Sequence, residues 1–277
     1  MILTIGFITT RRELSTAPGL DKLIVLARVF FAAPLAVFGA EHFAASKSIM
    51  QVVPPWMPGR LFWTYFVGLC LIAAALSLVL TKYLRLSAPL LAILFFLFVA
   101  MIHLPNVAAN PKDRFVWAVA VRDLSFASGA CALAVTVRAP GSNALLMLAR
   151  WYIALAVLFF AVEHFLHPEF APGVPLPKVT PDWVPLHLLL GYPAGAILLI
   201  GGALMLVLKH ARAAAAWAGL LFTLLTFVLY LPIMSTATKT AGLLEGQNYI
   251  FDTLLYAGAV LLLAAAMPKN QPAPLAR

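Results

Sequence analysis

Nine polar residues with chemically useful side chains stand within long apolar stretches of the chain, where a polar side chain costs several kcal/mol in a membrane. In chain order they are Glu41, His42, His103, Arg122, Asp123, Glu163, His164, Tyr230 and Asp252. A carboxylate beside an imidazole can exchange a proton near neutral pH, because histidine titrates there and burial raises the pKa of a carboxyl group. The nine residues are therefore the candidate ligand-binding set.

Three uses of these side chains remain open from the sequence. They bind or protonate a small ligand, or Arg122 pairs with Glu41 or Asp123 only to fix helix packing. The third use is haem ligation, which needs facing histidines such as His42 and His103. Tyr230 stands where a second copy of His103 would be, so haem is disfavoured, and no metal site and no catalytic residue are predicted.

Adjacent residues on a helix point about 100° apart. We therefore expect only one of Glu41 and His42 to face a cavity, and the other to face a neighbouring helix or the lipid headgroups.

The elements that position these residues follow from composition. The 277 residues are 63% hydrophobic and 10% charged, with a mean hydropathy of +0.97, against about 45–50% apolar and about 25% charged for soluble domains. A bilayer cannot hydrogen-bond exposed backbone groups, so such a chain must form helices or a closed barrel. The apolar runs are long and continuous rather than alternating, which favours helices. We expect an all-α integral membrane protein whose surroundings are the lipid bilayer.

About 20 apolar residues cross the hydrocarbon layer, and eight runs approach this length. We predict transmembrane helices at 22–45, 61–81, 86–105, 115–137, 145–166, 186–208, 213–233 and 248–266. The domains are then an N-terminal segment 1–21, a first four-helix unit 22–138, a second unit 145–266 and a tail 267–277. The net charge of +9 comes from basic residues strung out between apolar runs, so no nucleic-acid partner is expected.

The distribution of basic residues predicts the orientation. One side of the membrane receives Arg11, Arg12, Lys22, Lys82, Arg85, Arg138, Lys209, Arg212, Lys269 and Arg277, and the other receives Lys47, Arg60, Lys112, Arg114, Lys178 and Lys239. By the positive-inside rule we expect both termini to be cytoplasmic. The loops 46–60 and 167–185 then face outward, and their proline and aromatic residues suit rigid caps in the membrane interface.

The two halves of the chain match each other at shifts of 122 to 129 residues. Glu41-His42-Phe43 recurs as Glu163-His164-Phe165, His103-Leu-Pro as Tyr230-Leu-Pro, and Asp123 as Asp252, while Phe251 replaces Arg122. Two units with an even number of helices must run parallel, related by an axis along the membrane normal. We therefore predict two parallel four-helix bundles related by an internal repeat, each with a cavity in the outer third of the membrane.

Five segments carry a resemblance to a known family. They are Glu41-His42-Phe43, Val53 to Pro58, Gly68, His103-Leu-Pro-Asn and Arg122-Asp123-Leu. Together they resemble the DoxX family of small bacterial membrane proteins, which typically form a single four-helix unit. Residues 22–266 look like two such units fused. Some relatives are similar to the membrane subunit of a thiosulfate:quinone oxidoreductase, and others are linked to oxidative stress. The resemblance implies a fold and a redox setting but no catalytic residues.

The leading expectation is a membrane subunit that binds an apolar or quinone-like ligand, or a lipid, and serves a redox protein partner. One rival is a noncatalytic scaffold or assembly factor, and another is a small-solute or proton transporter. Only Arg28 and Arg150 lie in the cytoplasmic half, where a transport pathway would need polar groups. We expect these two arginines to reach the inner lipid headgroups. Whether the chain is an enzyme stays open.

Overall fold

The computed structural model describes residues 1–138, 143–174, 178–236 and 240–269. This part of the chain consists of helices joined by loops, and its only β pairing is one isolated bridge between Phe170 and Val179. The helices are α1 Ile2–Thr16, α2 Asp21–Val25, α3 Ala27–Ala44, α4 Ser46–Ile49, η1 Met50–Val52, α5 Arg60–Leu80, α6 Leu84–Phe98, η2 Val99–His103, α7 Leu104–Ala109, α8 Arg114–Arg138, α9 Asn143–Leu166, α10 Gly191–Leu206, α11 Leu208–Leu224, η3 Leu225–Tyr230, α12 Leu231–Ser235 and α13 Thr240–Ala266. The all-α class is confirmed. Lys239 and most of the predicted tail lie outside the described residues.

Six helical stretches are long and apolar enough to cross a membrane, as a multi-pass membrane protein requires. They are Arg60–Leu80, Leu84–Ala109, Arg114–Arg138, Ala144–Leu166, Leu208–Ser235 and Glu245–Ala266. The other two predicted spans are shorter. The first breaks at Leu26, and α3 reaches spanning length only together with the segment 46–52, from which it is bent by 94°. The sixth begins at Gly191 rather than 186, which leaves α10 with 16 residues.

Two of the long helical stretches contain a π-helical turn. The sequence suggests that the third span ends at Pro105, yet the helix continues to Ala109. A proline lacks an N–H group and its ring crowds the carbonyl four residues earlier, so the helix widens into a π turn instead of ending. The second such turn ends at Tyr230, just before Pro232. His103 and Tyr230 each close a π turn.

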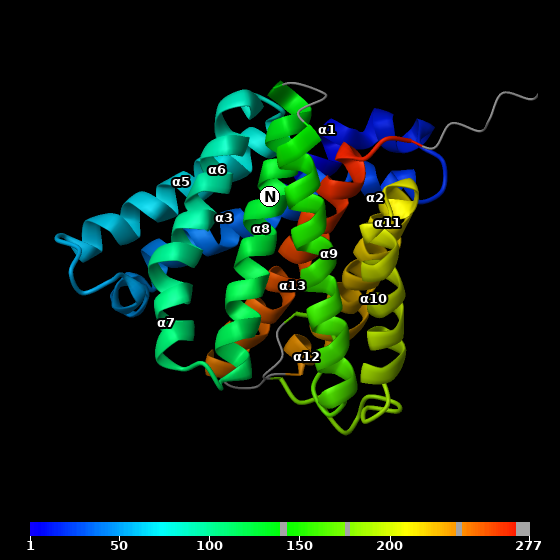
Figure 1. The fold of residues 1–277 in the computed structure, drawn as a ribbon. Helices are drawn as coiled ribbons and strands as arrows, with labels where there is room; N and C mark the ends of the chain where they lie inside the picture. Colours follow the sequence, from blue (N-terminus) through cyan, green and yellow to red (C-terminus); the bar gives the residue numbers. More distant parts are fainter. Residues whose placement is uncertain (139–142, 175–177, 237–239, 270–277) are drawn as a thin grey trace, which may run out of the picture.

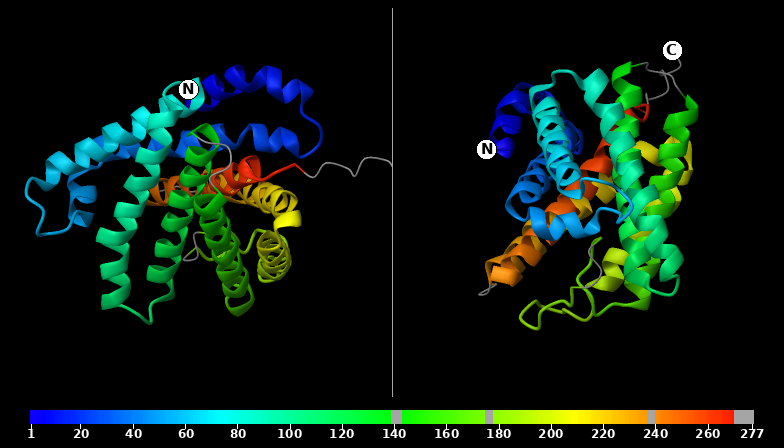
Figure 2. Two further views of the ribbon diagram at one scale, coloured as in Figure 1. Left: turned by 45° about the horizontal axis from the view of Figure 1, so that its top comes forward. Right: turned by 90° about the vertical axis from the view of Figure 1, so that its left-hand side faces the viewer.

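The helices of the two halves interleave around α8 and α13, which contact each other and are the most buried of the long helices. Helix α3 packs against α5 and α13, and α9 packs against α10 and α8. Helices α6 and α11 pack on the central helices α8 and α13, respectively. The pair α3 and α5 crosses α8 and α9 at a steep angle in both Figure 1 and Figure 2. The two predicted bundles are therefore not separate bodies.

The N-terminal segment is a helix that the sequence did not predict. Helix α1 lies across α3 and α5, and Gly6 contacts Val29 so closely that a Cβ there would lie 2.5 Å from the valine Cγ1. The hydroxyl of Thr9 donates to the carbonyl of Val79 over 3.0 Å. The first 16 residues are thus part of the packed structure.

Candidate functional site

A polar network joins the two central helices. Arg122 of α8 donates from Nη1 to Asp252 Oδ2 of α13 over 2.6 Å, and from Nε to Asp123 Oδ1 over 3.2 Å. His103, at the end of η2, donates from Nε2 to Asp123 Oδ2 over 2.8 Å. Two carboxyl groups thus share one guanidinium group, and the imidazole of His103 completes the network.

Beside this network lies a cavity of about 270 Å³, close to the lower end of the ~300–1,000 Å³ typical of ligand pockets. Its polar lining is Glu41, His42, Arg122, Asp123, Asn248 and Asp252, and its aromatic lining is Phe38, Phe95, Phe98 and Phe126. One cavity was expected in each half, whereas residues of both halves line this one. The reason is the interleaved packing, which brings α13 against α3.

Both Glu41 and His42 line the cavity, so the expectation that only one of them would do so is wrong. The cavity lies at the end of α3, where α5 and α13 both approach. Close contact with α5 is possible because Gly68 has no side chain: a Cβ there would lie 2.7 Å from the Cβ of His42.

Three groups in the cavity have hydrogen-bonding capacity left over. The Nδ1–H of His42 donates to the carbonyl of Phe38 over 2.7 Å, so in the neutral ring Nε2 is an acceptor. Glu41 accepts from Gln247 Nε2 at Oε1 over 2.7 Å, which leaves Oε2. Within the described chain, neither His42 Nε2, nor Glu41 Oε2, nor Arg122 Nη2 has a hydrogen-bond partner. The cavity therefore offers an acceptor, an acid and a donor against an aromatic wall.

The matching residues of the second half have protein partners instead. The Nδ1 of His164 hydrogen-bonds the Phe160 carbonyl, as in His42, but its Nε2 accepts the backbone N–H of Gly173 over 2.8 Å. Glu163 Oε2 accepts from Arg114 Nε over 2.9 Å. The hydroxyl of Tyr230 lies 3.2 Å and 3.1 Å from the carbonyls of Ala171 and Pro172. These bonds fix residues 171–173 of the loop between α9 and α10, and the side chains expected to bind a ligand are engaged with the protein instead.

The length of the loop between α9 and α10 explains why the second half has no open site at the matched residues. The loop after α9 is about five residues longer than the loop after α3, as the shift between the matched segments indicates. The extra chain folds back, and Ala171 and Val174 become buried. Glu163, His164 and Tyr230 are 9%, 2% and 1% exposed, and none of the three lines the cavity at Glu41.

Sequence reasoning missed Gln247, Asn248 and Arg114 as members of these sites. Gln247 was placed outside the last span, which was predicted to begin at 248, whereas α13 begins at Thr240. The short polar sequence from Glu245 to Asn248 at the start of an apolar run was the available signal. Among the described residues no group of three or more His, Cys, Asp or Glu side chains could hold a metal ion.

Comparison with known protein families gives a match to part of the chain. A family model described as a domain of unknown function, DUF8561, matches residues 31–122, which is less than half of the chain. The matched region runs from α3 into α8 and includes Glu41, His42, His103 and Arg122. No curated protein and no solved structure matches the chain.

Proposed function

We propose that this chain is a multi-pass protein of the bacterial inner membrane that binds a quinone-like ring in the cavity at Glu41, His42 and Arg122. In this proposal it acts as the membrane subunit for a redox protein partner, as its resemblance to DoxX proteins suggests. The observation that carries the proposal is the contrast between two histidines. His164 Nε2 takes a backbone N–H from Gly173, whereas His42 Nε2, in the same tripeptide, is left open beside a cavity.

The open groups suit the two redox forms of a quinone. A quinone carbonyl oxygen only accepts hydrogen bonds, and Arg122 Nη2 is a donor in the cavity. A quinol hydroxyl can donate, and His42 Nε2 is an acceptor. Reduction of a quinone takes up protons as well as electrons. Glu41 and His42 would exchange the protons, and the electrons would come from the redox partner. The four phenylalanines offer faces and edges for the ring.

Eight membrane crossings and an internal repeat are part of the same proposal, and several matched features support them. Gly68 and Gly195 each contact the Cβ of the histidine and the ring of the following phenylalanine in the matched tripeptides. The π turns that end at His103 and Tyr230 occupy matched positions. The packing of α3 on α5 and α13 resembles that of α9 on α10 and α8. Helices α3 and α10 would be short crossings, and both termini would be cytoplasmic by the positive-inside rule.

The test is a titration of the purified full chain with a short-chain benzoquinone, in which the quenching of tryptophan fluorescence reports binding. We expect saturable binding that weakens about tenfold in His42→Leu, a loss of about 1.4 kcal/mol that is typical of one hydrogen bond in a binding site. Glu41→Gln should change the pH dependence of binding. The matched control is His210→Leu, since His210 is exposed on α11 and lies outside the cavity. Binding that does not saturate, or that is equal in all variants, would refute the proposal.

A noncatalytic scaffold is the second candidate, favoured by the bond between Arg122 and Asp252, which ties one half to the other. If the network only joins helices, Arg122→Leu leaves two carboxylates without a counter-charge and destabilises the protein by about 3–5 kcal/mol. Neutralising both carboxylates as well, with Asp123→Asn and Asp252→Asn, should then restore stability. A scaffold would tolerate this triple variant in cells, whereas a quinone-binding subunit would lose activity with its partner.

A further inference from the structure

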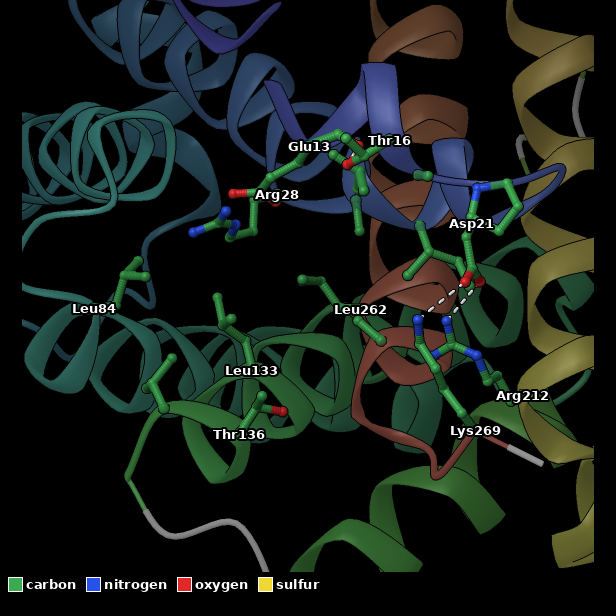
Figure 3. A pocket seen from close by; sticks show the side chains of 17 residues that line it. Glu13, Thr16, Asp21, Arg28, Leu84, Leu133, Thr136, Arg212, Leu262 and Lys269 are labelled. Carbon is green, nitrogen blue, oxygen red and sulfur yellow. Dashed lines mark hydrogen bonds and ion pairs between the residues drawn. The ribbon is translucent and has the colours of Figure 1, made fainter. Parts of the chain in front are cut away.

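A second and larger cavity lies at the opposite end of α3 from Glu41, where α1, α2 and the end of α13 meet. Its volume is about 540 Å³, and Figure 3 shows the side chains that line it. Much of the wall is apolar, including Leu84, Leu133, Val137 and Leu262. The polar part consists of five charged groups, Glu13, Asp21, Arg28, Arg212 and Lys269, together with Thr16 and Thr136.

Two of the cations are already paired. Arg212 Nη2 lies 2.6 Å from Asp21 Oδ1, and Lys269 Nζ lies 3.2 Å from Asp21 Oδ2. Arg28 is different, because it has no hydrogen bond or ion pair with any residue that the structure describes. Its guanidinium group lies across open space from Leu84 and Leu133 (Figure 3).

The matched arginine of the second half indicates what Arg28 lacks. Ala149-Arg150 repeats Ala27-Arg28 in the sequence. Arg150 is 5% exposed, and its Nη1 donates to the carbonyls of Met205 and Leu206 over 3.1 Å and 2.9 Å at the end of α10. A guanidinium group partly withdrawn from water needs acceptors, because burying an unpaired charge is unfavourable. Among the residues that the structure describes, none supplies such an acceptor to Arg28, which lines the cavity instead.

The charges of the lining identify the kind of acceptor. Arg28, Arg212 and Lys269 oppose Glu13 and Asp21, so the lining has one positive charge in surplus. A phosphodiester carries a single negative charge and several acceptor oxygens, and Arg is well suited to bind it. The apolar wall beside Arg28 suits an acyl chain. By the positive-inside rule this end of the bundle faces the cytoplasmic leaflet, where anionic lipids are found and where basic pockets between helices bind their headgroups.

We propose that this cavity binds the phosphodiester headgroup of an anionic phospholipid, with Arg28 as the principal contact. The site is separate from the quinone-like site, and neither proposal depends on the other.

The experiment uses the purified full chain, stripped of lipid in detergent and then titrated with phosphatidylglycerol, while native mass spectrometry counts the bound lipid. Phosphatidylcholine with the same acyl chains is the second probe, and inorganic phosphate is the third. We expect the Kd for phosphatidylglycerol to weaken about tenfold in Arg28→Gln. Arg11→Gln is the matched control, since Arg11 is exposed on α1 and does not line the cavity. Arg28→Lys should retain part of the affinity, because the charge remains.

Equal affinity for phosphatidylglycerol in Arg28→Gln and Arg11→Gln would overturn the proposal, as would equal affinity of the unmodified protein for the two lipids. Displacement of phosphatidylglycerol by millimolar inorganic phosphate would assign the cavity to free phosphate and overturn the lipid assignment. Affinities are compared only between variants whose melting temperature and elution volume match those of the unmodified protein. If Arg28→Gln fails to fold, the ratio of affinities for the two lipids in Arg28→Lys decides the question.

Discussion

The contrast between the two matched histidines predicts two different effects of one substitution on stability. In His164→Leu the backbone N–H of Gly173 loses its acceptor while remaining buried. Leaving a buried donor unsatisfied costs about 1–3 kcal/mol. The Phe160 carbonyl also loses its bond to Nδ1, but as a carbonyl within α9 it keeps its helical partner, so its contribution is small.

The same substitution at His42 should have little effect on folding. The only hydrogen bond that His42→Leu removes is the one to the carbonyl of Phe38, which is likewise bonded within its helix. No buried donor is left without a partner in the described structure, and leucine suits the phenylalanine lining. We therefore expect a change in unfolding free energy of about 0.5 kcal/mol or less, the range of substitutions that break no buried bond.

The assay is thermal unfolding of the two variants in the same detergent, without added quinone. At about 2–4 °C per kcal/mol for a chain of this size class, His164→Leu should lower Tm by about 2–12 °C and His42→Leu by about 2 °C or less. A control with His164→Gln tests the mechanism, because an amide oxygen can still accept from the Gly173 N–H. Equal losses at the two positions would refute the reasoning, since it would mean that the Gly173 bond contributes nothing.

Three further predictions rest on single residues. Burial alone would raise the pKa of Asp21 above its ordinary value of 3.8. The hydrogen bonds from Arg212 and Lys269 outweigh burial and lower this pKa. The stability that the depressed pKa contributes is therefore complete above pH 3.8 and is lost as the pH falls through the folded-state pKa. In melting curves from pH 7 to pH 3, the Tm of Asp21→Asn should therefore fall less with acid than the Tm of the unmodified protein. Gly68→Ala should destabilise the protein by about 1–3 kcal/mol, because the new Cβ would meet the backbone of α3. Gly201→Ala should be tolerated in the same melts, since its nearest neighbour would be 3.8 Å away. Arg150→Gln should lower Tm by removing the cap at the end of α10, and an unchanged Tm would contradict that role.

The helical class and the places of the long apolar helices could be predicted because they follow from local composition. The helix at Ile2–Thr16 was not predicted, because its mixed sequence is not a long apolar run, and its packing on α3 and α5 joins residues distant in the chain. The extension past Pro105 was missed because a proline usually marks a helix boundary, and here a π turn accommodates it.

The candidate site was predicted in its residue types but not in its assembly. The polar residues in apolar runs drew attention to Arg122 and Asp252, which are in fact bonded. Their pairing was missed because the two halves were expected to fold as separate bundles. The closure of the second site depends on where the loop after α9 folds back. The donor that closes the second site is the backbone N–H of Gly173. Every residue except proline has such a group, so a comparison of matching tripeptides cannot show which one will reach His164.

The interleaving of the halves has a consequence for how the protein is made. Gln247 and Glu41 are 206 residues apart in the chain, yet they share a hydrogen bond, and α3 packs on α13 rather than on α8. While the ribosome is still synthesising the middle of the chain, α3 lacks its later neighbour, and Glu41 is without the amide of Gln247. The first site is thus completed by one of the last segments to be translated. A chain arrested before α13 would leave that carboxylate without its hydrogen-bond donor and α3 without one of its two main packing partners.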